Sequence, residues 1–473
     1  MKKRRITLLA LALSLSGAAA QAESLRDIYE LALANDAQLK TEEAQYKANL
    51  ETENLGRAAL LPQISGNYSY TNDDQDVKAQ SLGLNNAGAL AAINTRTNTD
   101  TDTDGYQVTL SQAIFDLPAW FTFKSGKEVT RQAEATFAAN QQNLIVRVVE
   151  AYLTVLRAQD NLSASKAAER AFERQLEQTQ QRFEVGLIAI TDVYEAQAAY
   201  DLSHVNRIVD ENNVKVALEN LSVLTGQYHD NLDVLIDEFE AKLPEPMDRA
   251  QWVDFALENN FNLQAARYGE EASRITAKAR KFEHAPRIVG SYVYQDYDTD
   301  GDIDIKPSSP LTSSPDRDLE LNQWQISLQV PIFSGGAVSA NRRKAAEEFN
   351  AARESRVNLI RNTVTSTRSL HMTVVSDVSR VAARKQSIVS SKSALDATQA
   401  GYEVGTRNVV DVLNAQNTLF AAQRDYANSR YDYIVDMLRL KEAAGLLSPE
   451  DIYTLDDALK NAPAPTASST SSP

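Results

Sequence analysis

The sequence predicts a mostly helical chain with four membrane strands, assembled from two copies of one unit. Three observations lead to this fold class. A motif of pattern E-V-G-x5-D-V-x2-A-Q occurs twice, at residues 182–197 and 401–416, which are 219 residues apart. Long segments without Gly or Pro flank both copies. Pairs of segments with period-two polarity precede each helical part, so each repeat is predicted as helix–strand–strand–helix–helix.

The two motif copies are predicted to be the turns of very long helical hairpins. Neither Gly nor Pro occurs in 127–185, 187–225, 337–400 or 406–444. A helix from about residue 120 to 185 is on the order of 100 Å long at ~1.5 Å per residue, far longer than a globular core needs. Such helices span a space or line a tube. The last one carries a seven-residue coiled-coil repeat at Val412, Leu419, Tyr426, Tyr433 and Leu440.

Four segments alternate apolar and polar residues and have a proline at the helix side, where a missing N–H is tolerated. We expect strands at about 62–72, 106–117, 286–297 and 322–333, with long polar loops between the members of each pair. Their length is about the 9–11 residues that a membrane strand needs. Alternation alone also fits two hairpins of a soluble sheet.

The number of strands predicts an oligomer. Known single-chain barrels begin at about eight strands, so four strands cannot close one. An open edge in lipid would leave backbone groups unpaired. A membrane location therefore requires several chains to share one barrel.

Aromatic residues cluster where the predicted strands meet the helices. An interfacial girdle at the membrane surface has this composition. Packing beneath the sheet is the alternative for the same residues, which are Phe115, Trp120, Phe121, Phe123 and Phe333.

The ends of the chain have distinct compositions. Met1–Ala22 reads as a cleavable signal peptide, with a basic start, a short apolar run and Ala-Gln-Ala before Glu23. The short acidic segments 228–247 and 446–459 are expected to pack together as a belt with 24–34. The predicted organisation is signal peptide 1–22, repeat 23–226, connector 227–250, repeat 251–445, equatorial segment 446–461 and a low-complexity, disordered tail 462–473.

Charge and composition exclude several classes. The net charge is −16, and it becomes −20 when the four basic residues of the signal peptide are removed. This disfavours a basic face for nucleic acid or for an anionic lipid surface. The chain has no Cys, which excludes disulfides and thiolate metal sites. The four His residues are scattered, and no phosphate-binding or catalytic motif is present, so we expect neither an enzyme nor a cofactor.

One motif requires separate treatment. Residues 100–105 and 296–301 both read D-x-D-x-D-G, as in an EF-hand loop. An EF-hand also needs Glu at position twelve, where this chain has Ser111 and Pro307. We therefore expect two solvated loops rather than calcium sites.

These features together resemble the TolC-type outer-membrane efflux channels, also called outer membrane factors. The likeness covers nearly the whole mature chain and is most specific in residues 182–200 and 401–420. It implies a homotrimer whose twelve-strand β-barrel in the outer membrane continues as a helical tunnel through the periplasm. It implies the export of drugs, other small toxic compounds or secreted proteins. The implied partners are a periplasmic adaptor, an inner-membrane transporter of the RND, ABC or MFS class, and outer-membrane lipid, with no nucleic acid.

The resemblance also implies roles for individual residues. Links that hold the periplasmic end shut should involve Thr191, Asp192, Tyr402 and Arg407. Asp411 should form an acidic ring at the constriction, and Asn414 should make the second ring neutral. The alternative for Asp192 and Asp411 is helix capping. The adaptor-docking tips should be Val185, Gly186, Leu187, Val404, Gly405 and Thr406.

Two other classes of protein share some of these features. A periplasmic adaptor is also exported and has a long helical hairpin, but normally a single one between β-rich domains. A coiled-coil scaffold of the cell envelope would lack the period-two strands with their proline stops.

Overall fold

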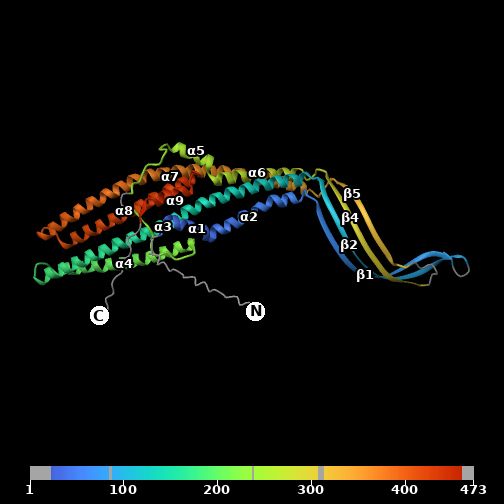
Figure 1. Cartoon of the computed structure of the whole chain (residues 1–473), viewed down its shortest axis with the longest axis horizontal. Coiled ribbons are helices and arrows are strands. Elements are labelled where there is room, and N and C mark those ends of the chain that lie inside the picture. Colours follow the sequence, from blue (N-terminus) through green and yellow to red (C-terminus); the bar gives the residue numbers. More distant parts are fainter. Residues whose placement is uncertain (1–22, 85–87, 237–238, 307–313, 461–473) are drawn as a thin grey trace, which may run out of the picture. The chain divides into compact units, whose positions relative to one another are not determined.

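A computed structural model describes residues 23–84, 88–236, 239–306 and 314–460 (Figure 1). The signal-peptide prediction and the predicted tail 462–473 lie outside these residues. The chain divides into two compact units. The helical unit comprises residues 1–46, 135–264 and 357–473, and the sheet unit comprises residues 47–134 and 265–356. Each unit therefore contains parts of both sequence repeats.

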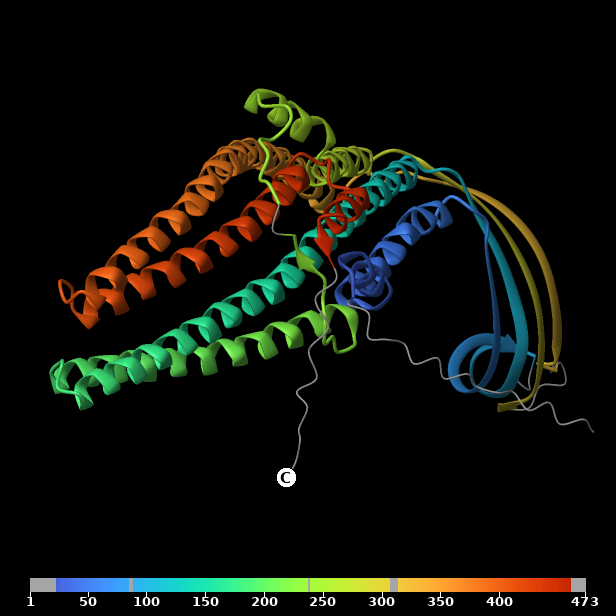
Figure 2. The ribbon, with the colours of Figure 1, turned by 60° about the vertical axis from the view of Figure 1, so that its left-hand side comes forward.

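The helical unit consists mainly of helices, and parts of several helices also belong to the sheet unit. The two hairpins α3/α4 and α7/α8 agree with the predicted helices to within a few residues, and their turns lie at the same end of the helical unit (Figure 2). The helices are α1 (Leu25–Asn35), α2 (Ala37–Ala58), α3 (Leu117–Glu184), α4 (Ile190–Thr225), α5 (Arg249–Asn259), α6 (Phe261–Lys281), α7 (Ala337–Glu403), α8 (Val409–Ala443) and α9 (Pro449–Asp456).

The core of the helical unit lies along the middle of α3. Leu144, Val148, Tyr152 and Val155 are fully buried there, at the three- and four-residue spacing of one helix face. They pack in one cluster with α1, α4 and α8. The heptad positions of α8 contribute Tyr433 and Leu440 to this cluster, as expected for a coiled-coil seam.

A small belt joins the segments that follow the two repeats. Strand β3 (Val234–Leu235) pairs antiparallel with β6 (Leu459–Lys460). Glu23 forms a parallel bridge with Leu232, and its carboxylate meets the buried ring of His229. The segments predicted to form a belt therefore lie together.

The sheet unit contains one antiparallel sheet in the order β1-β2-β4-β5 (Figure 2). The strands are β1 (Gln63–Leu84), β2 (Leu90–Phe115), β4 (Arg287–Lys306) and β5 (Arg317–Gln329). One row across all four strands places Ile64, Leu110, Tyr292 and Trp324 side by side. The face that carries this row is the apolar face predicted from the alternation.

Most strands are longer than the sequence analysis predicted, and the expected solvated loops are strands. Both D-x-D-x-D-G motifs lie inside the paired parts of β2 and β4, with Asp100 opposite Asp302 and Asp104 opposite Asp298. The prediction failed because the two motif segments consist mostly of Asp and Thr, so no apolar period marks them. Ladder hydrogen bonds use only the backbone, and the alternating Thr residues of β2 favour extended structure.

The glycines of these motifs have a packing role. A Cβ atom at Gly105 would lie 2.2 Å from the backbone oxygen of Asp296 and 2.5 Å from the Tyr297 ring. At Gly301 it would lie 2.3 Å from the backbone oxygen of Asp100. Only glycine permits this close approach between β2 and β4.

The predicted girdle residues surround the junction between strands and helices. Phe121 stacks on Phe282 with ring centres 5.3 Å apart, and Trp120 and Phe123 are 5.8 Å apart. Trp120 and Phe115 are each about 43% exposed, and Phe333 is 82% exposed. In the single chain, some rings of this group are therefore packed and others are exposed.

Candidate gate at the hairpin tips

Both hairpins turn through the same backbone motif. Gly186 and Gly405 have φ of +77°, which is the left-handed conformation that glycine adopts without strain. At the first tip the N–H of Gly186 donates to Phe183 (2.9 Å), and the N–H of Leu187 donates to Arg182 (2.9 Å). At the second tip Gly405 donates to Tyr402 (3.1 Å) and Thr406 to Gly401 (2.8 Å). These are Schellman motifs, so the shared glycine of the repeat ends each long helix.

The tip residues leave apolar side chains exposed. Val185, Leu187 and Val404 are 69%, 72% and 75% exposed, and Thr406 is also exposed. Isolated exposed apolar residues need no explanation, but here they stand together at the end of each hairpin. The tips therefore offer small apolar surfaces on a rigid turn.

The helix that follows the second tip begins with a capping box. The side chain of Asn408 accepts from the N–H of Asp411 (2.8 Å), and the Asp411 carboxylate accepts from the N–H of Asn408 (3.4 Å). The corresponding N-cap residue of α4 is Ala189, whose methyl side chain cannot accept a hydrogen bond. Asp411 thus has the capping role weighed in the sequence analysis, whereas Asp192 only lies in the first turn of α4.

Arg407, which precedes α8, lies beside the first turn of that helix. Its Nη1 is 3.7 Å from the carboxylate of Asp411, and both side chains are partly exposed. A Cβ atom at Gly401 would lie 2.9 Å from Arg407 Cγ, so the missing side chain of Gly401 makes room for the arginine. Exposed pairs of this kind are weak, which leaves Arg407 free to change partners.

Tyr402 of α7 packs between the second hairpin and the first. It is 5% exposed and packs with Phe172 of α3 and with Val412 and Leu413 of α8. The guanidinium of Arg182 on α3 lies over its ring, 4.6 Å from the centre. Among the described residues, its hydroxyl has no hydrogen-bond partner. An unpaired buried hydroxyl is costly, so the site is only partly satisfied in the single chain.

Thr191 and Asp192 stand apart from the other proposed gate residues. Within the part of the chain that the structure describes, no hydrogen bond or ion pair joins either of them to Tyr402 or Arg407. The structure brings Arg182 to Tyr402, a contact that the sequence analysis missed. The repeat could have indicated this contact, because Arg182 of the first copy matches Gly401 of the second, the residue directly before Tyr402.

Asp411 and Asn414 are three residues apart on α8, hence on neighbouring positions of one helix face. In the single chain Asp411 is partly exposed and Asn414 is exposed. Within the described ranges, no group of three or more His, Asp or Glu side chains is arranged to hold a metal ion.

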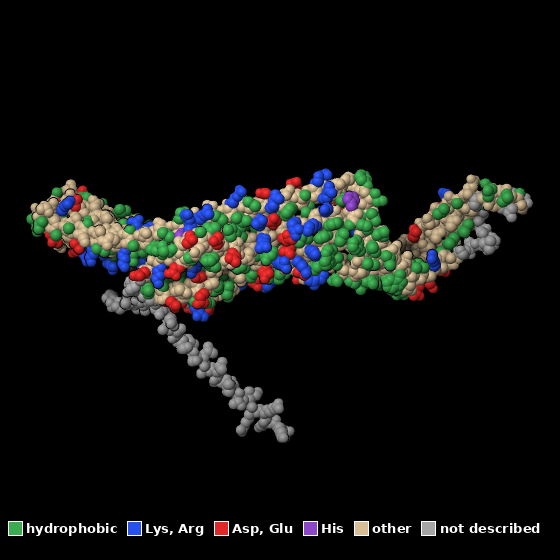
Figure 3. Space-filling view, turned by 90° about the horizontal axis from the view of Figure 1, so that it is seen from above, with side chains coloured by type: hydrophobic (Ala, Val, Ile, Leu, Met, Phe, Trp, Pro, Cys, Tyr) green, Lys and Arg blue, Asp and Glu red, His purple; other side chains and the backbone are tan. Residues whose placement is uncertain are grey.

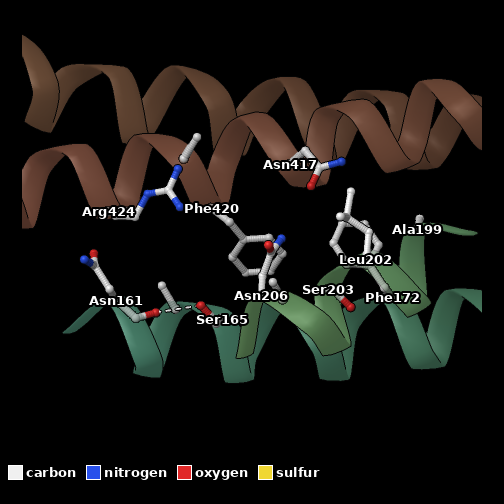
Figure 4. Close-up of a pocket in the computed structure, with 13 residues that line it drawn as sticks. Asn161, Ser165, Phe172, Ala199, Leu202, Ser203, Asn206, Asn417, Phe420 and Arg424 are labelled. Atoms are coloured by element: carbon white, nitrogen blue, oxygen red, sulfur yellow. Dashed lines mark hydrogen bonds between the residues drawn. The ribbon is translucent and has the colours of Figure 1, made fainter. Parts of the chain in front are cut away.

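A cavity separates the two hairpins beyond the tips (Figure 4). It has a volume of about 170 Å³ and lies between α8 on one side and α3 and α4 on the other. Phe420 points into it from α8, and Arg424, Asn161 and Ser165 stand at one end. Phe420 and Phe172 of α3, which both line the cavity, meet edge to face with ring centres 6.3 Å apart.

Further along the hairpins, a charge network joins three helices. Asp432 of α8 accepts from Arg157 of α3 (2.6 Å) and lies 3.6 Å from Arg380 of α7. Arg380 also contacts Asp377 at 2.8 Å. Arg439 of α8 links Glu150 of α3 (2.7 Å) with Asp436 (3.8 Å).

Asp377 is the buried member of this network, with 1% of its surface exposed. Burial raises the pKa of Asp377 to about 6, and the nearby carboxylates Asp436 and Asp432 add to the rise while Arg380 opposes it. Nothing in the sequence marks this residue, because its burial depends on how α7 packs on α8.

None of the described helices combines the length and the apolar character that crossing a bilayer requires.

Comparison with known proteins identifies the class of this protein. The family model described as "Outer membrane efflux protein" matches residues 28–227 and 252–446, which is most of the chain and both repeats. The chain therefore belongs to this family of outer-membrane export channels, which is a transport family rather than an enzyme family.

Individual relatives agree over nearly full length. The outer membrane protein TolC of Vibrio cholerae is 34% identical over 464 residues, covering 97% of this chain and 99% of that protein. The proteases secretion protein PrtF of Dickeya chrysanthemi is 27% identical, covering 98% and 96%. The crystal structure of the CmeC outer membrane channel of Campylobacter jejuni has the same fold, with a TM-score of 0.72, 15% identity, and coverage of 97% and 96%.

These findings confirm the resemblance, the class of function and the outer-membrane location predicted from the sequence. The alternatives of a periplasmic adaptor or a coiled-coil scaffold are set aside, because the matched family is that of the channel itself.

Proposed function

We propose that three copies of this chain form one export duct, with a shared twelve-strand barrel and a helical tunnel that is gated at the hairpin tips. The open sheet is the observation that supports a shared barrel. Its outer strands β1 and β5 each have a partner on one side only among the described strands. Four strands are too few to close a barrel, and open edges in lipid are costly. Pairing β5 of one chain with β1 of the next would satisfy both edges.

The aromatic residues at the junction of strands and helices fit this arrangement. Phe115, Trp120, Phe121, Phe123 and Phe333 would then stand at the membrane surface next to the periplasm, where aromatic girdles occur. The apolar row through Tyr292 and Trp324 would face lipid.

The observation that carries the gate proposal is the attachment of α7 and α8 to α3 and α4. Near the tips the second hairpin contacts the first through Tyr402 and Arg182, and beyond them a cavity lies between the two hairpins. In the duct, Arg407 would change partners and link to Thr191 or Asp192 across hairpins or between chains. Arg407 can do this because its own pair with Asp411 is long and exposed.

Asp411 and Asn414 would face the axis of the duct. Three carboxylates close to an axis favour cations at a narrow aperture and slow anions. The ring formed by Asn414 would be neutral. Of these two rings, only the acidic one formed by Asp411 would then select for cations.

The tips would receive the partner that opens the duct. Val185, Gly186, Leu187, Val404, Gly405 and Thr406 form rigid turns with exposed apolar side chains, which suits docking of a periplasmic adaptor. The energy would come from an inner-membrane transporter of the RND, ABC or MFS class. The name of the relative PrtF, a proteases secretion protein, supports secreted proteins as exported molecules, and the family description supports efflux.

The test measures trimers and conductance together. The purified protein should run as a heat-resistant trimer and form discrete channels in planar lipid bilayers. The Arg407→Ser variant should conduct more than the parent, since it removes a closing link. Lys385→Gln, at an exposed position of α7 far from the tips, is the matched control. Monomers without channel activity would refute the duct, and channels unaffected by Arg407→Ser would refute this gate.

A further inference from the structure

Six basic side chains of the sheet unit form no ion pair within 4 Å among the described residues. They lie in the parts of α3, α6 and α7 that adjoin the strands, and all six are exposed. We call this group the basic collar, which consists of Lys124, Lys127, Lys278, Lys281, Arg342 and Arg343.

The collar borders an apolar band. In the space-filling view, hydrophobic side chains cover the place where the helices of the sheet unit meet the strands, and Lys and Arg side chains stand beside them (Figure 3). Lys124 lies over the Trp120 ring, 5.2 Å from its centre, and Lys127 lies over Phe123 at 4.7 Å. Trp rings with neighbouring lysines are typical of the level of lipid headgroups.

The other end of the band carries the opposite charge. Along β2 and β4, three pairs of aspartates face each other, at Asp100/Asp302, Asp102/Asp300 and Asp104/Asp298. These pairs begin six residues beyond the row of Leu110 and Tyr292, roughly 20 Å at ~3.3 Å per residue. The charge therefore changes sign across the apolar band.

We propose that the basic collar binds the phosphate headgroups of anionic phospholipids in the leaflet that adjoins the helices. This proposal rests on the proposed function, in which the sheet spans the membrane. Lysine and arginine near a bilayer surface attract anionic lipid, and each adds to the total. The partner is a phospholipid headgroup, because the collar follows a membrane boundary rather than lining a closed pocket.

The net charge of the chain argues against such binding, as the sequence analysis stated. Net charge is a sum over the whole chain, however, whereas a headgroup responds to charges within a Debye length of about 8 Å at physiological salt. At that range the neighbouring carboxylates of Glu271 and Glu283 are already paired with Arg274 and Arg280, so the collar adds positive charge in excess, and the aspartate pairs lie on the far side of the band.

The experiment measures which lipid gathers at the protein boundary. Trimers would be reconstituted in phosphatidylcholine bilayers containing a trace of spin-labelled phosphatidylglycerol or spin-labelled phosphatidylcholine. Electron spin resonance then gives the ratio of the two association constants. We expect the parent protein to favour phosphatidylglycerol about fivefold at low salt, and this preference should fall toward one at about 1 M salt.

Two variants with equal loss of charge sharpen the test. Lys124→Gln/Lys278→Gln/Lys281→Gln should reduce the preference to about twofold, since three of the six collar charges remain. Lys166→Gln/Lys385→Gln/Lys392→Gln, which removes three exposed lysines of the helical unit, should leave it unchanged. If the collar variant does not assemble, Lys278→Gln/Lys281→Gln takes its place with an intermediate preference expected.

The outcomes separate this proposal from the proposed function. Normal channels in the parent protein without a lipid preference would overturn the collar and leave the duct intact. An equal loss of preference in both triple variants would also overturn it, since net charge would then explain the effect. A parent protein that neither assembles nor inserts would overturn the duct, and the collar with it.

Discussion

The two hairpin tips are copies of one turn that have been given different tasks. Both end a helix of more than sixty residues with a glycine at φ +77° and the same pair of backbone hydrogen bonds. They differ in the side chains at matched positions. The second tip has Arg407 and Asn408 where the first has Ile188 and Ala189.

This difference separates what builds a hairpin from what controls it. The backbone turn needs only the glycine, which both copies keep. Charged and capping groups gather on the second copy, where Arg407, Asn408 and Asp411 contact one another. Exchanging residues between the copies is therefore a direct way to separate the two roles.

The largest expected effect is at Tyr402, whose counterpart in the first copy is Phe183. Tyr402 is buried, whereas Phe183 is 40% exposed. Truncation of a buried aromatic residue costs about 3–5 kcal/mol, so Tyr402→Ala should detach the second hairpin and raise single-channel conductance severalfold. Phe183→Ala should change conductance little. Equal increases in both variants would show that the tips are equivalent and would contradict the comparison.

A second contrast lies along the helices, where buried Asp377 of the second copy matches buried Ala158 of the first. Because the pKa of Asp377 is raised to about 6, the folded state binds a proton more tightly than the unfolded state. Stability should therefore fall as pH rises from about 4 to about 6 and then level off. Asp377→Asn should remove this dependence and stabilise the protein at neutral pH by about 1–3 kcal/mol. Thermal unfolding of both proteins across this range tests it, and parallel pH profiles would refute it.

A smaller effect is expected at the constriction. Asp411→Ala should weaken block of the channel by a trivalent cation about tenfold, equivalent to ~1.4 kcal/mol, because an acidic ring is lost. Asn414→Ala, one turn further, should change the block less than about twofold. Asp192→Ala repeats the substitution in the first copy and should leave the block unchanged. The blocking constant from planar bilayers decides, and a large effect at Asn414 would assign the aperture to a different ring.

The smallest effect concerns the helix caps. Asn408→Ala gives the second copy the cap of the first and should cost about 1 kcal/mol, since the capping box is lost. The reverse change, Ala189→Asn, should stabilise α4 by a similar amount or less. Hydrogen exchange of the first-turn amides would measure both. No change at Asn408 would mean that packing rather than capping fixes the start of α8.

The sequence predicted the helices and turns well, because glycines bound the long uninterrupted segments at the tips. It predicted the inner halves of the strands, where apolar residues alternate. It missed the outer halves, because in the D-x-D-x-D-G segments polar Asp alternates mainly with polar Thr, so no apolar pattern marks them even though the backbone pairs. At the candidate site the resemblance named Tyr402 and Asp411, whose roles in the gate stay predictions. The contact of Tyr402 with Arg182 and the burial of Asp377 depend on which helices lie side by side, which periodicity cannot tell.

The unequal lengths of the outer strands have one further consequence. β1 has 22 residues and β5 has 13, so a neighbour's β5 would be too short to cover all of β1. In each subunit of the proposed trimer, β1, β2 and the outer part of β4 would then extend beyond the rim of the barrel, with one edge of β1 unpaired. Such an edge is the natural place to attach an epitope or a fluorescent label, and the place where a strand from another molecule could add itself to the sheet.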